Sequence, residues 1–285
     1  MTWGPARLAE RERQPHRVPA HTRLPGSGDV LKDHRRPGDK NQTIGNQIVV
    51  EPDGTLIDGT LVILNKGGKG HNGRSLLEVA VMRSSDGGTT WSSPIVVSPL
   101  QEAPVTIPGK PVRTGDILPE VAVNSSTGTL YAAWQEGSFS ANGIAHVAFS
   151  QSTNGGLNWS TPIHIDQAPA TVAAFTPVMH VAASGRIGVT YYDQESATAA
   201  SPGLTDVFIV SCSSKCTAPS SWAAGGETRL DTNGPFDMTT APNAGGLFTG
   251  DYEGLTSSGN TFDALFVMTL SNDDGTTDLF FDTAS

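Results

Sequence analysis

The sequence predicts an all-β fold built from repeated units of four short antiparallel strands. Three observations support this fold class. Glycine and proline are frequent, with 32 and 19 residues, and they divide the 285-residue chain at short intervals. No long stretch has apolar residues with the period of an amphipathic helix, so we expect few helices. Trp91, Trp159 and Trp222 recur 68 and 63 residues apart, which indicates an internal repeat.

Each unit opens with two apolar runs that a Gly-containing turn connects, as in a β-hairpin. Four such pairs follow one another: 46–50 with 61–64, 118–123 with 130–134, 178–182 with 187–192, and 252–255 with 264–268. Third strands are expected over 77–81, 146–150, 207–210 and 279–281, and fourth strands over 94–97, 162–165 and 227–230. Four antiparallel strands in about 60 residues are typical of one blade of a β-propeller.

We therefore predict a propeller with blades at about 41–100, 111–167, 175–232 and 236–285. The last unit stops after its third strand, and a propeller must close on itself to hide its edges. The sequence thus favours a truncated propeller with about four blades present and others missing before residue 41. The segment 1–40 is rich in Arg, Pro and His and lacks strand periodicity, so we expect it to be disordered or foreign to the fold.

The charge distribution bears on partners. The net charge is −10, although residues 1–40 hold nine of the 18 basic residues and only five of the 28 acidic ones. An acidic body argues against nucleic acid as a partner, because phosphate contacts need clustered Lys and Arg. No apolar run is long enough to span a bilayer, so we expect no membrane insertion. The N-terminus also lacks the apolar stretch of a signal peptide.

Two cysteines, Cys212 and Cys216, have a spacing that can close a small loop as a disulfide. Such a bond would add about 2 kcal/mol in the chain-entropy model. It would imply an oxidising compartment, extracellular or periplasmic. The alternative is two free thiols in a cytosolic protein.

The turns before the first two tryptophans share one pattern. The first reads Ser84-x-Asp86-x-Gly88-x-Thr90-Trp91, and the second reads Ser152-x-Asn154-x-Gly156-x-Asn158-Trp159. The pattern resembles the Asp-box, or BNR repeat, of the sialidase superfamily. In such a turn the carboxylate caps backbone N–H groups, Gly accepts a positive φ and the Trp ring packs between sheets. We expect a structural role for these residues: Ser84, Asp86, Gly88, Trp91, Asn154, Gly156 and Trp159.

The resemblance extends over about 41–285. The segments 113–119, 188–193 and 249–255 are similar to those of bacterial sialidase-like, or exo-α-sialidase-like, proteins. This implies a glycoside hydrolase acting on extracellular glycans. The alternative is a catalytically inactive propeller that binds glycan or protein.

Propeller topology predicts where a site would lie. The starts of first strands and the ends of second strands share one face, opposite the Asp-box turns, and polar residues gathered there indicate a ligand site. The alternative is that these residues cap turns. The candidate catalytic residues are Asp116, Tyr192, Asp193, Tyr252 and Glu253. The candidate ligand-binding residues are Gln47, Arg113, Gln135, Glu136 and Asp251.

The resemblance implies specific roles. Sialidases use a Tyr nucleophile with a Glu partner, an Asp acid/base and three arginines that hold the substrate carboxylate. Either Tyr252–Glu253 or Tyr192 with Glu195 would supply the Tyr–Glu pair, and Asp116 the acid. The early Arg-Ile-Pro motif of the family is absent. Beyond residue 41 the arginines are Arg74, Arg83, Arg113, Arg186 and Arg229. The number of these arginines that face the central channel of the propeller distinguishes the two functions. Three would favour a sialidase, whereas one or none would favour binding without catalysis.

The sequence predicts no cofactor and no metal site. His146, His164 and His180 fall inside predicted strands, where packing or surface roles are expected. The acidic face offers oxygen ligands for Ca²⁺ as an alternative, but no Asp-x-Asp-x-Asp loop supports it. Residues 272–275 are expected to form a hairpin turn.

Overall fold

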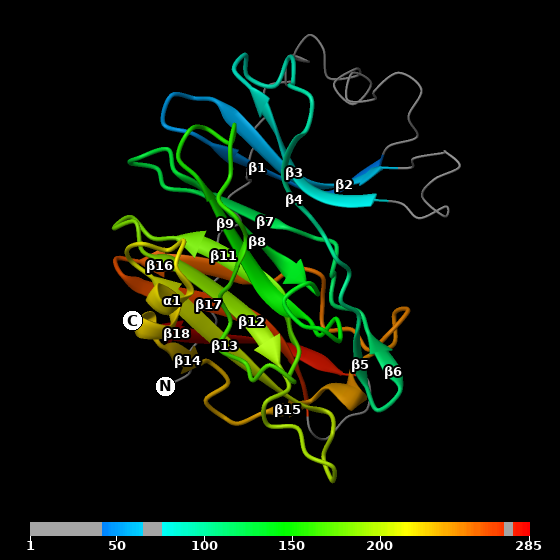
Figure 1. The fold of residues 1–285 in the computed structure, drawn as a ribbon. Helices are drawn as coiled ribbons and strands as arrows, with labels where there is room; N and C mark the ends of the chain where they lie inside the picture. The colour runs from blue at the N-terminus through cyan, green and yellow to red at the C-terminus, as the bar shows by residue number, and fades with distance from the viewer. Residues whose placement is uncertain (1–41, 65–75, 271–275) are drawn as a thin grey trace, which may run out of the picture.

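The computed structural model describes residues 42–64, 76–270 and 276–285, and these residues form an all-β structure (Figure 1). Within them the helical elements are α1 (Pro219–Gly225) and the 3-10 turn η1 (Met238–Thr240). The strands form several antiparallel sheets. The prediction of an all-β chain with few helices is confirmed. The predicted N-terminal segment 1–40 and the turn at 272–275 lie outside the described residues.

Four sheets follow one another along the chain, each with strands paired in sequence order. The first contains β1 (Gln42–Val50), β2 (Leu56–Leu64), β3 (Leu76–Ser84) and β4 (Ile95–Pro99). The second contains β7 (Glu120–Val123), β8 (Leu130–Glu136), β9 (His146–Ser152) and β10 (Ile163–His164). The third contains β11 (Ala174–Val181), β12 (Ile187–Asp193), β13 (Leu204–Cys212) and β14 (Glu227–Arg229), with β15 (Phe236–Asp237) also on β13. The fourth contains β16 (Gly254–Ser258), β17 (Thr261–Thr269) and β18 (Thr277–Ala284).

A small hairpin, β5 (Val105–Ile107) and β6 (Lys110–Val112), lies between the first and second sheets in the chain and was not predicted. Its buried Val105, Ile107 and Val112 pack in the same apolar core as the fourth sheet. The hairpin thus contacts a sheet that comes much later in the chain. Residues 113–118, which follow the hairpin, lie next to the segment that precedes β16, because the Arg113 N–H bonds to Leu247 O at 2.9 Å.

The sheets stack face to face in chain order. One apolar core joins the first and second sheets, another the second and third, and another the third and fourth. Two strand glycines show how closely the faces approach. A Cβ at Gly59 would lie 2.7 Å from Val121, and one at Gly188 would lie 2.7 Å from the Phe262 ring. Strands β8 and β12 are buried along their whole length, which explains why most of their residues are apolar.

The first strand of each sheet contacts the first strand of the next, so β1, β7, β11 and β16 are neighbours in turn. Figure 1 shows the four sheets arranged in this order from the blue to the red end of the chain. Within the described residues no strand pairing joins the first sheet to the fourth.

The turns between β3 and β4 and between β9 and β10 use one hydrogen-bond pattern. Asp86 accepts hydrogen bonds from the Ser84 hydroxyl at 2.8 Å and the Thr90 N–H at 2.9 Å, and the Gly88 N–H donates to Ser84 at 2.8 Å. The Thr90 N–H and hydroxyl, followed by Ser84, lower the pKa of Asp86 to about 2. The second turn repeats the three bonds at 2.9–3.0 Å with Ser152, Asn154, Gly156 and Asn158.

The third sheet replaces this turn with a disulfide loop. Cys212 and Cys216 are bonded, with Cα atoms 5.8 Å apart. Helix α1 follows this loop, and Pro219 occupies the first turn of the helix. Trp222 on this helix donates its indole N–H to Cys216 O at 2.8 Å, just as Trp159 donates to Gly156 O at 3.1 Å. Loop and helix thus hold Trp222 against Phe149 of the second sheet, at 4.9 Å between ring centroids.

Candidate functional site

Three of the predicted site residues line one pocket. Arg113, Asp116 and Asp251 border a hollow of about 250 Å³. Its other lining residues are Ile44, Pro104, Val112, Thr114, Gly115, Ile117 and Leu118. Arg113 and Asp251 form an ion pair with a 2.6 Å N–O distance. We call this hollow the Arg113–Asp251 pocket.

A tight turn presents Asp116 to the pocket. Gly115 has a φ of 64°, in the left-handed region that glycine adopts without strain, and the Leu118 N–H bonds to Gly115 O at 2.8 Å. Burial raises the pKa of Asp116, and the charge of Glu102 raises it further. The direction of this shift is the one that a general acid requires.

Tyr192 and Glu253 form a pair across two sheets. The Tyr192 hydroxyl donates to Glu253 at 2.8 Å, and the Val267 N–H donates to this hydroxyl at 3.0 Å. Tyr192 is only 1% exposed. Burial raises the pKa of Glu253 to about 7, and burial with the nearby Glu253 carboxylate raises that of Tyr192. The tyrosine of one predicted pair thus bonds to the glutamate of the other, while Tyr252 is 67% exposed.

Gln135 and Glu136 are held in buried hydrogen bonds. Gln135 donates to Ala103 O at 2.7 Å and accepts from the Thr176 N–H at 3.4 Å. Glu136 accepts from the Trp134 indole at 2.9 Å and from the Ser138 N–H at 2.9 Å, which is the arrangement of a turn cap. Neither residue lines the Arg113–Asp251 pocket.

Thr176 connects this region to the pocket. Its hydroxyl donates to the backbone carbonyl of Thr114, a pocket residue, at 2.8 Å. Its φ is 51°, which is unusual for a β-branched residue. Backbone strain of this kind persists only where surrounding contacts impose it, and such positions cluster near binding sites.

Asp193 lies in a separate acidic group within the third sheet. It is fully buried, and burial raises its pKa to about 8. One oxygen accepts the Glu195 N–H at 3.0 Å, while the other has no hydrogen-bond partner in the part of the chain that the structure describes. Asp206 and Asp231 are nearby, and Arg229 pairs with both. This group does not line the Arg113–Asp251 pocket.

Glu120 is a half-buried carboxylate that sequence reasoning missed. Gln47 of β1 donates to it at 3.1 Å and accepts the Val121 N–H at 2.6 Å, and the Met179 N–H of β11 bonds to Glu120 as well. Glu120 therefore lies where the first strands of three sheets meet. Burial raises its pKa to about 7. An acidic residue that opens an otherwise apolar strand, Glu120–Val123, is the feature that would have identified it.

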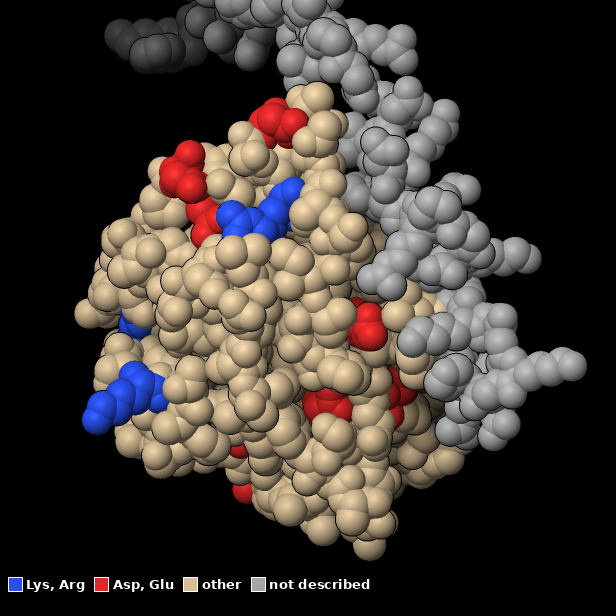
Figure 2. Space-filling view, turned by 45° about the horizontal axis from the view of Figure 1, so that its top comes forward, with Lys and Arg blue, Asp and Glu red and all other residues tan. Residues whose placement is uncertain are grey.

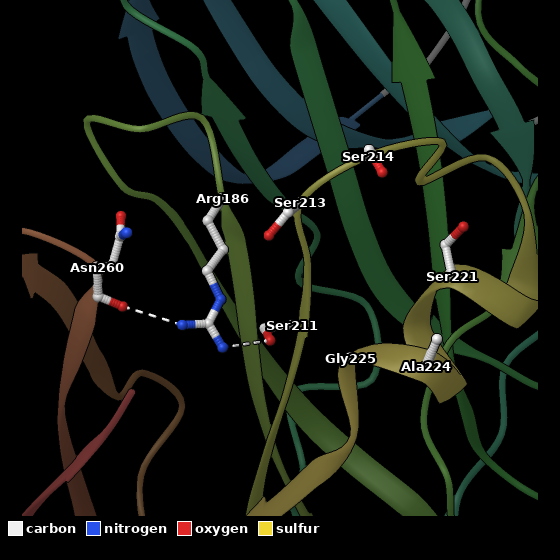
Figure 3. Close-up of a pocket in the computed structure, with 8 residues that line it drawn as sticks. All are labelled: Arg186, Ser211, Ser213, Ser214, Ser221, Ala224, Gly225 and Asn260. Carbon is white, nitrogen blue, oxygen red and sulfur yellow. Dashed lines mark hydrogen bonds between the residues drawn. The ribbon is translucent and has the colours of Figure 1, made fainter.

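A larger hollow of about 440 Å³ lies beside Arg186 of the β11–β12 turn, the residues that follow β13, and helix α1 (Figure 3). Figure 3 shows Arg186 between Asn260 and Ser211, with Ser213, Ser214 and Ser221 along the rim. Arg186 donates to Asn260 O at 3.1 Å and to the Ser211 hydroxyl at 2.8 Å. None of its eight lining residues is a carboxylate, imidazole or thiol, so this hollow offers no acid–base group.

Two observations concern the surface and the helices. Figure 2 shows one face, on which acidic and basic side chains form small separate groups without a continuous basic patch among the described residues. In the described parts of the chain, no helix has the length and apolar character needed to cross a membrane.

One group of residues, His146, His164 and Asp166, has the spacing of metal ligands.

No model of a known protein family matches the chain, and no curated protein matches it. Among solved structures, a protein of unknown function from Dyadobacter fermentans has a TM-score of 0.45 at 15% identity, covering 86% of this chain and 61% of that one. An N-acetylgalactosamine deacetylase from F. plautii, in complex with blood group B trisaccharide, has 0.43 at 10%, covering 87% and 72%. A PL25 ulvan lyase has 0.47 at 12%, covering 84% and 52%. The chain spans less than two thirds of the first and third, and these values assign it no activity.

Proposed function

We propose that the chain is a carbohydrate-binding β-propeller of the sialidase-like kind, in which the four sheets are successive blades. Two observations support the architecture: each sheet is a meander, and the first strand of each sheet contacts the first strand of the next. The shared hydrogen-bond pattern of the turns at Asp86 and Asn154 supports the sialidase-like character.

The Arg113–Asp251 pocket carries the proposal. It combines two carboxylates and a guanidinium with apolar side chains such as Ile117 and Leu118. Sugar recognition needs both features, because hydroxyls bond to charged groups while the C–H faces of the ring pack on apolar surface. A volume of about 250 Å³ is of the order of one monosaccharide unit.

The arginines that the structure describes already have partners within the fold, and this favours a neutral sugar over a sialic acid as the ligand. Arg113 already pairs with Asp251, donates to Ala244 O at 3.2 Å and lies 4.4 Å from the Phe248 ring centroid. Arg83 donates to Gly155 O. The other two arginines that the structure describes, Arg186 and Arg229, are also engaged in hydrogen bonds within the fold. A sugar carboxylate would have to compete with Asp251 for the one guanidinium in the pocket, within a chain of net charge −10.

A second candidate function is the exo-α-sialidase-like glycoside hydrolase that the sequence resemblance implies. The Tyr192–Glu253 hydrogen bond at 2.8 Å favours it, because sialidases use a Tyr–Glu pair, and so does the raised pKa of Asp116. Against it stands the burial of Tyr192, since a nucleophile must reach the anomeric carbon.

Binding and turnover distinguish the two functions. Binding would be measured by a glycan array and then by calorimetry with neutral oligosaccharides and sialyllactose, using Asp116→Asn and Asp251→Asn, with Asp278→Asn as an exposed charge-matched control. We expect a neutral glycan to bind, the two pocket variants to weaken it and the control to leave it unchanged. A protein that binds no glycan, or whose pocket variants bind like wild type, would refute the proposal.

Turnover would be measured with a fluorogenic sialoside and with neutral aryl glycosides. We expect no cleavage of the sialoside. Cleavage that Tyr192→Phe and Asp116→Ala abolish would establish the hydrolase instead. The Cys212–Cys216 disulfide supports an extracellular or periplasmic location for either function, because such bonds persist in oxidising compartments.

A further inference from the structure

Two histidines and an aspartate meet at one end of the second sheet. His146 is the first residue of β9, His164 is the last residue of β10, and Asp166 follows two residues later. The two strands are antiparallel, with His164 opposite Ala148, so the start of β9 and the end of β10 lie at the same end of the sheet. Residues that look scattered in the sequence therefore converge.

The distances among their polar atoms are short. His146 Nδ1 lies 3.1 Å from one oxygen of Asp166, and His164 Nε2 lies 2.8 Å from the other. One ligand atom from each of the three residues lies within 4.8 Å of the others. Ligand atoms on a tetrahedral Zn²⁺ are about 3.3 Å apart, since Zn–N and Zn–O bonds are about 2.0–2.2 Å. Small side-chain movements would thus place all three atoms around one ion.

The group is built into the sheet. The side chains of Asp166 and His146 are 0% and 2% exposed, and the Val147 N–H donates to Asp166 at 2.6 Å. The Phe139 ring stacks on His164, at 5.6 Å between centroids. The carboxylate and the His164 imidazole are therefore oriented by contacts outside the group, as metal ligands usually are.

His164 Nε2 has an unusual environment. This nitrogen is buried and lies 2.8 Å from Asp166 Oδ2, but it makes no hydrogen bond that meets the geometric criteria among the residues that the structure describes. A buried polar atom without a well-formed hydrogen bond is costly. Coordination to a cation by its lone pair would satisfy it.

The donor set selects the class of ion. Two imidazoles with one carboxylate suit Zn²⁺ and other late first-row divalent ions, whereas Ca²⁺ and Mg²⁺ prefer oxygen ligands alone. His164 is 35% exposed, and His164 and Asp166 border a hollow of about 360 Å³. We propose that His146, His164 and Asp166 bind a divalent ion of the zinc class, with a fourth ligand position open to this hollow. The site is independent of the Arg113–Asp251 pocket.

Metal binding to the full chain tests this directly. Protein treated with EDTA and dialysed would be titrated with Zn²⁺ by calorimetry and with Co²⁺ by visible absorption, which reports tetrahedral coordination. His164→Gln removes one ligand at the half-exposed position, where folding is least at risk. His180→Gln is the matched control, because His180 is a half-buried strand histidine whose Nε2 lies 3.0 Å from the Ser257 hydroxyl.

We expect one Zn²⁺ per wild-type chain, a Co²⁺ absorption band, and a rise in melting temperature with Zn²⁺. His164→Gln should weaken Zn²⁺ binding by more than about tenfold, because loss of even an outer partner costs that much. His180→Gln should bind as wild type does. Absence of Zn²⁺ binding by wild type, or equal binding by His164→Gln, would overturn the proposal. Equal loss in His180→Gln would do so too.

Discussion

Replacing Glu120 with Gln should make the stability of the protein less sensitive to pH. Glu120 is half-buried where β1, β7 and β11 meet, and desolvation raises its pKa from 4.5 to about 7. The folded state therefore binds this proton more tightly than the unfolded state does. A raised carboxyl pKa means that the free energy of unfolding falls as pH rises from about 4.5 to about 7 and is then constant.

The size of the effect follows from that shift. Above about pH 7 the ionised carboxylate costs the folded state up to about 3 kcal/mol, since each pKa unit corresponds to about 1.4 kcal/mol. At about pH 5.5 only about 1 kcal/mol of this penalty has developed. Gln keeps the shape and can still accept the Gln47 and Met179 hydrogen bonds, but it never ionises. The stability difference between Glu120→Gln and wild type should therefore grow by about 2 kcal/mol between about pH 5.5 and about pH 8.5.

Urea unfolding followed by fluorescence at both pH values would measure this difference. Asp278→Asn, which removes the same charge from an exposed position on β18, is the control for net charge. Its effect should be equal at the two pH values. If the advantage of Glu120→Gln did not increase with pH, or if the variant were less stable than wild type at about pH 8.5, the burial argument would be refuted.

Three further predictions concern the turns. Replacing Cys212 and Cys216 together by Ser should lower the free energy of unfolding by about 2 kcal/mol, measured in urea, because the five-residue loop loses its closure; unchanged stability would contradict this. Trp222→Phe should cost about 1–3 kcal/mol in the same assay, since Cys216 O loses its buried donor. Asp86→Ala should lower the melting temperature more than Asp86→Asn does, because Asn154 shows that an amide accepts the same bonds; equal melting temperatures would count against the shared role.

The all-β class and its successive antiparallel sheets could be predicted from the sequence because the signals for them are local. Strand alternation and glycine turns are read within about ten residues, and the spacing of Trp91, Trp159 and Trp222 gives the repeat. The hairpin β5–β6 and the helix α1 were missed for the opposite reason. The hairpin is stabilised by packing with the fourth sheet, more than a hundred residues away, and α1 is held by the disulfide loop and by Trp222.

The third turn shows how one structural role is met by different chemistry. In the second sheet, an Asn side chain and two glycines fix the turn that positions Trp159. In the third, the Cys212–Cys216 bond fixes a loop whose carbonyl receives the Trp222 indole. A sequence pattern written for side chains at fixed spacing therefore finds Trp222 but not the loop that holds it.

The candidate site was predicted less completely, and strand geometry explains why. Topology identifies the end of the sheet where a residue lies, but successive side chains point to opposite faces, and here both faces are buried against different sheets. Tyr191 points into the core with the second sheet, while Tyr192 points into the core with the fourth and reaches Glu253. Gln135 likewise reaches Thr176 of the third sheet, and Glu136 reaches the Gln101 N–H beside the first. The candidates that lie on strands, such as Tyr192, Gln135 and Glu136, are thus divided among separate inter-sheet spaces. Arg113, Asp116 and Asp251 meet because they come from connecting segments, where this alternation does not apply.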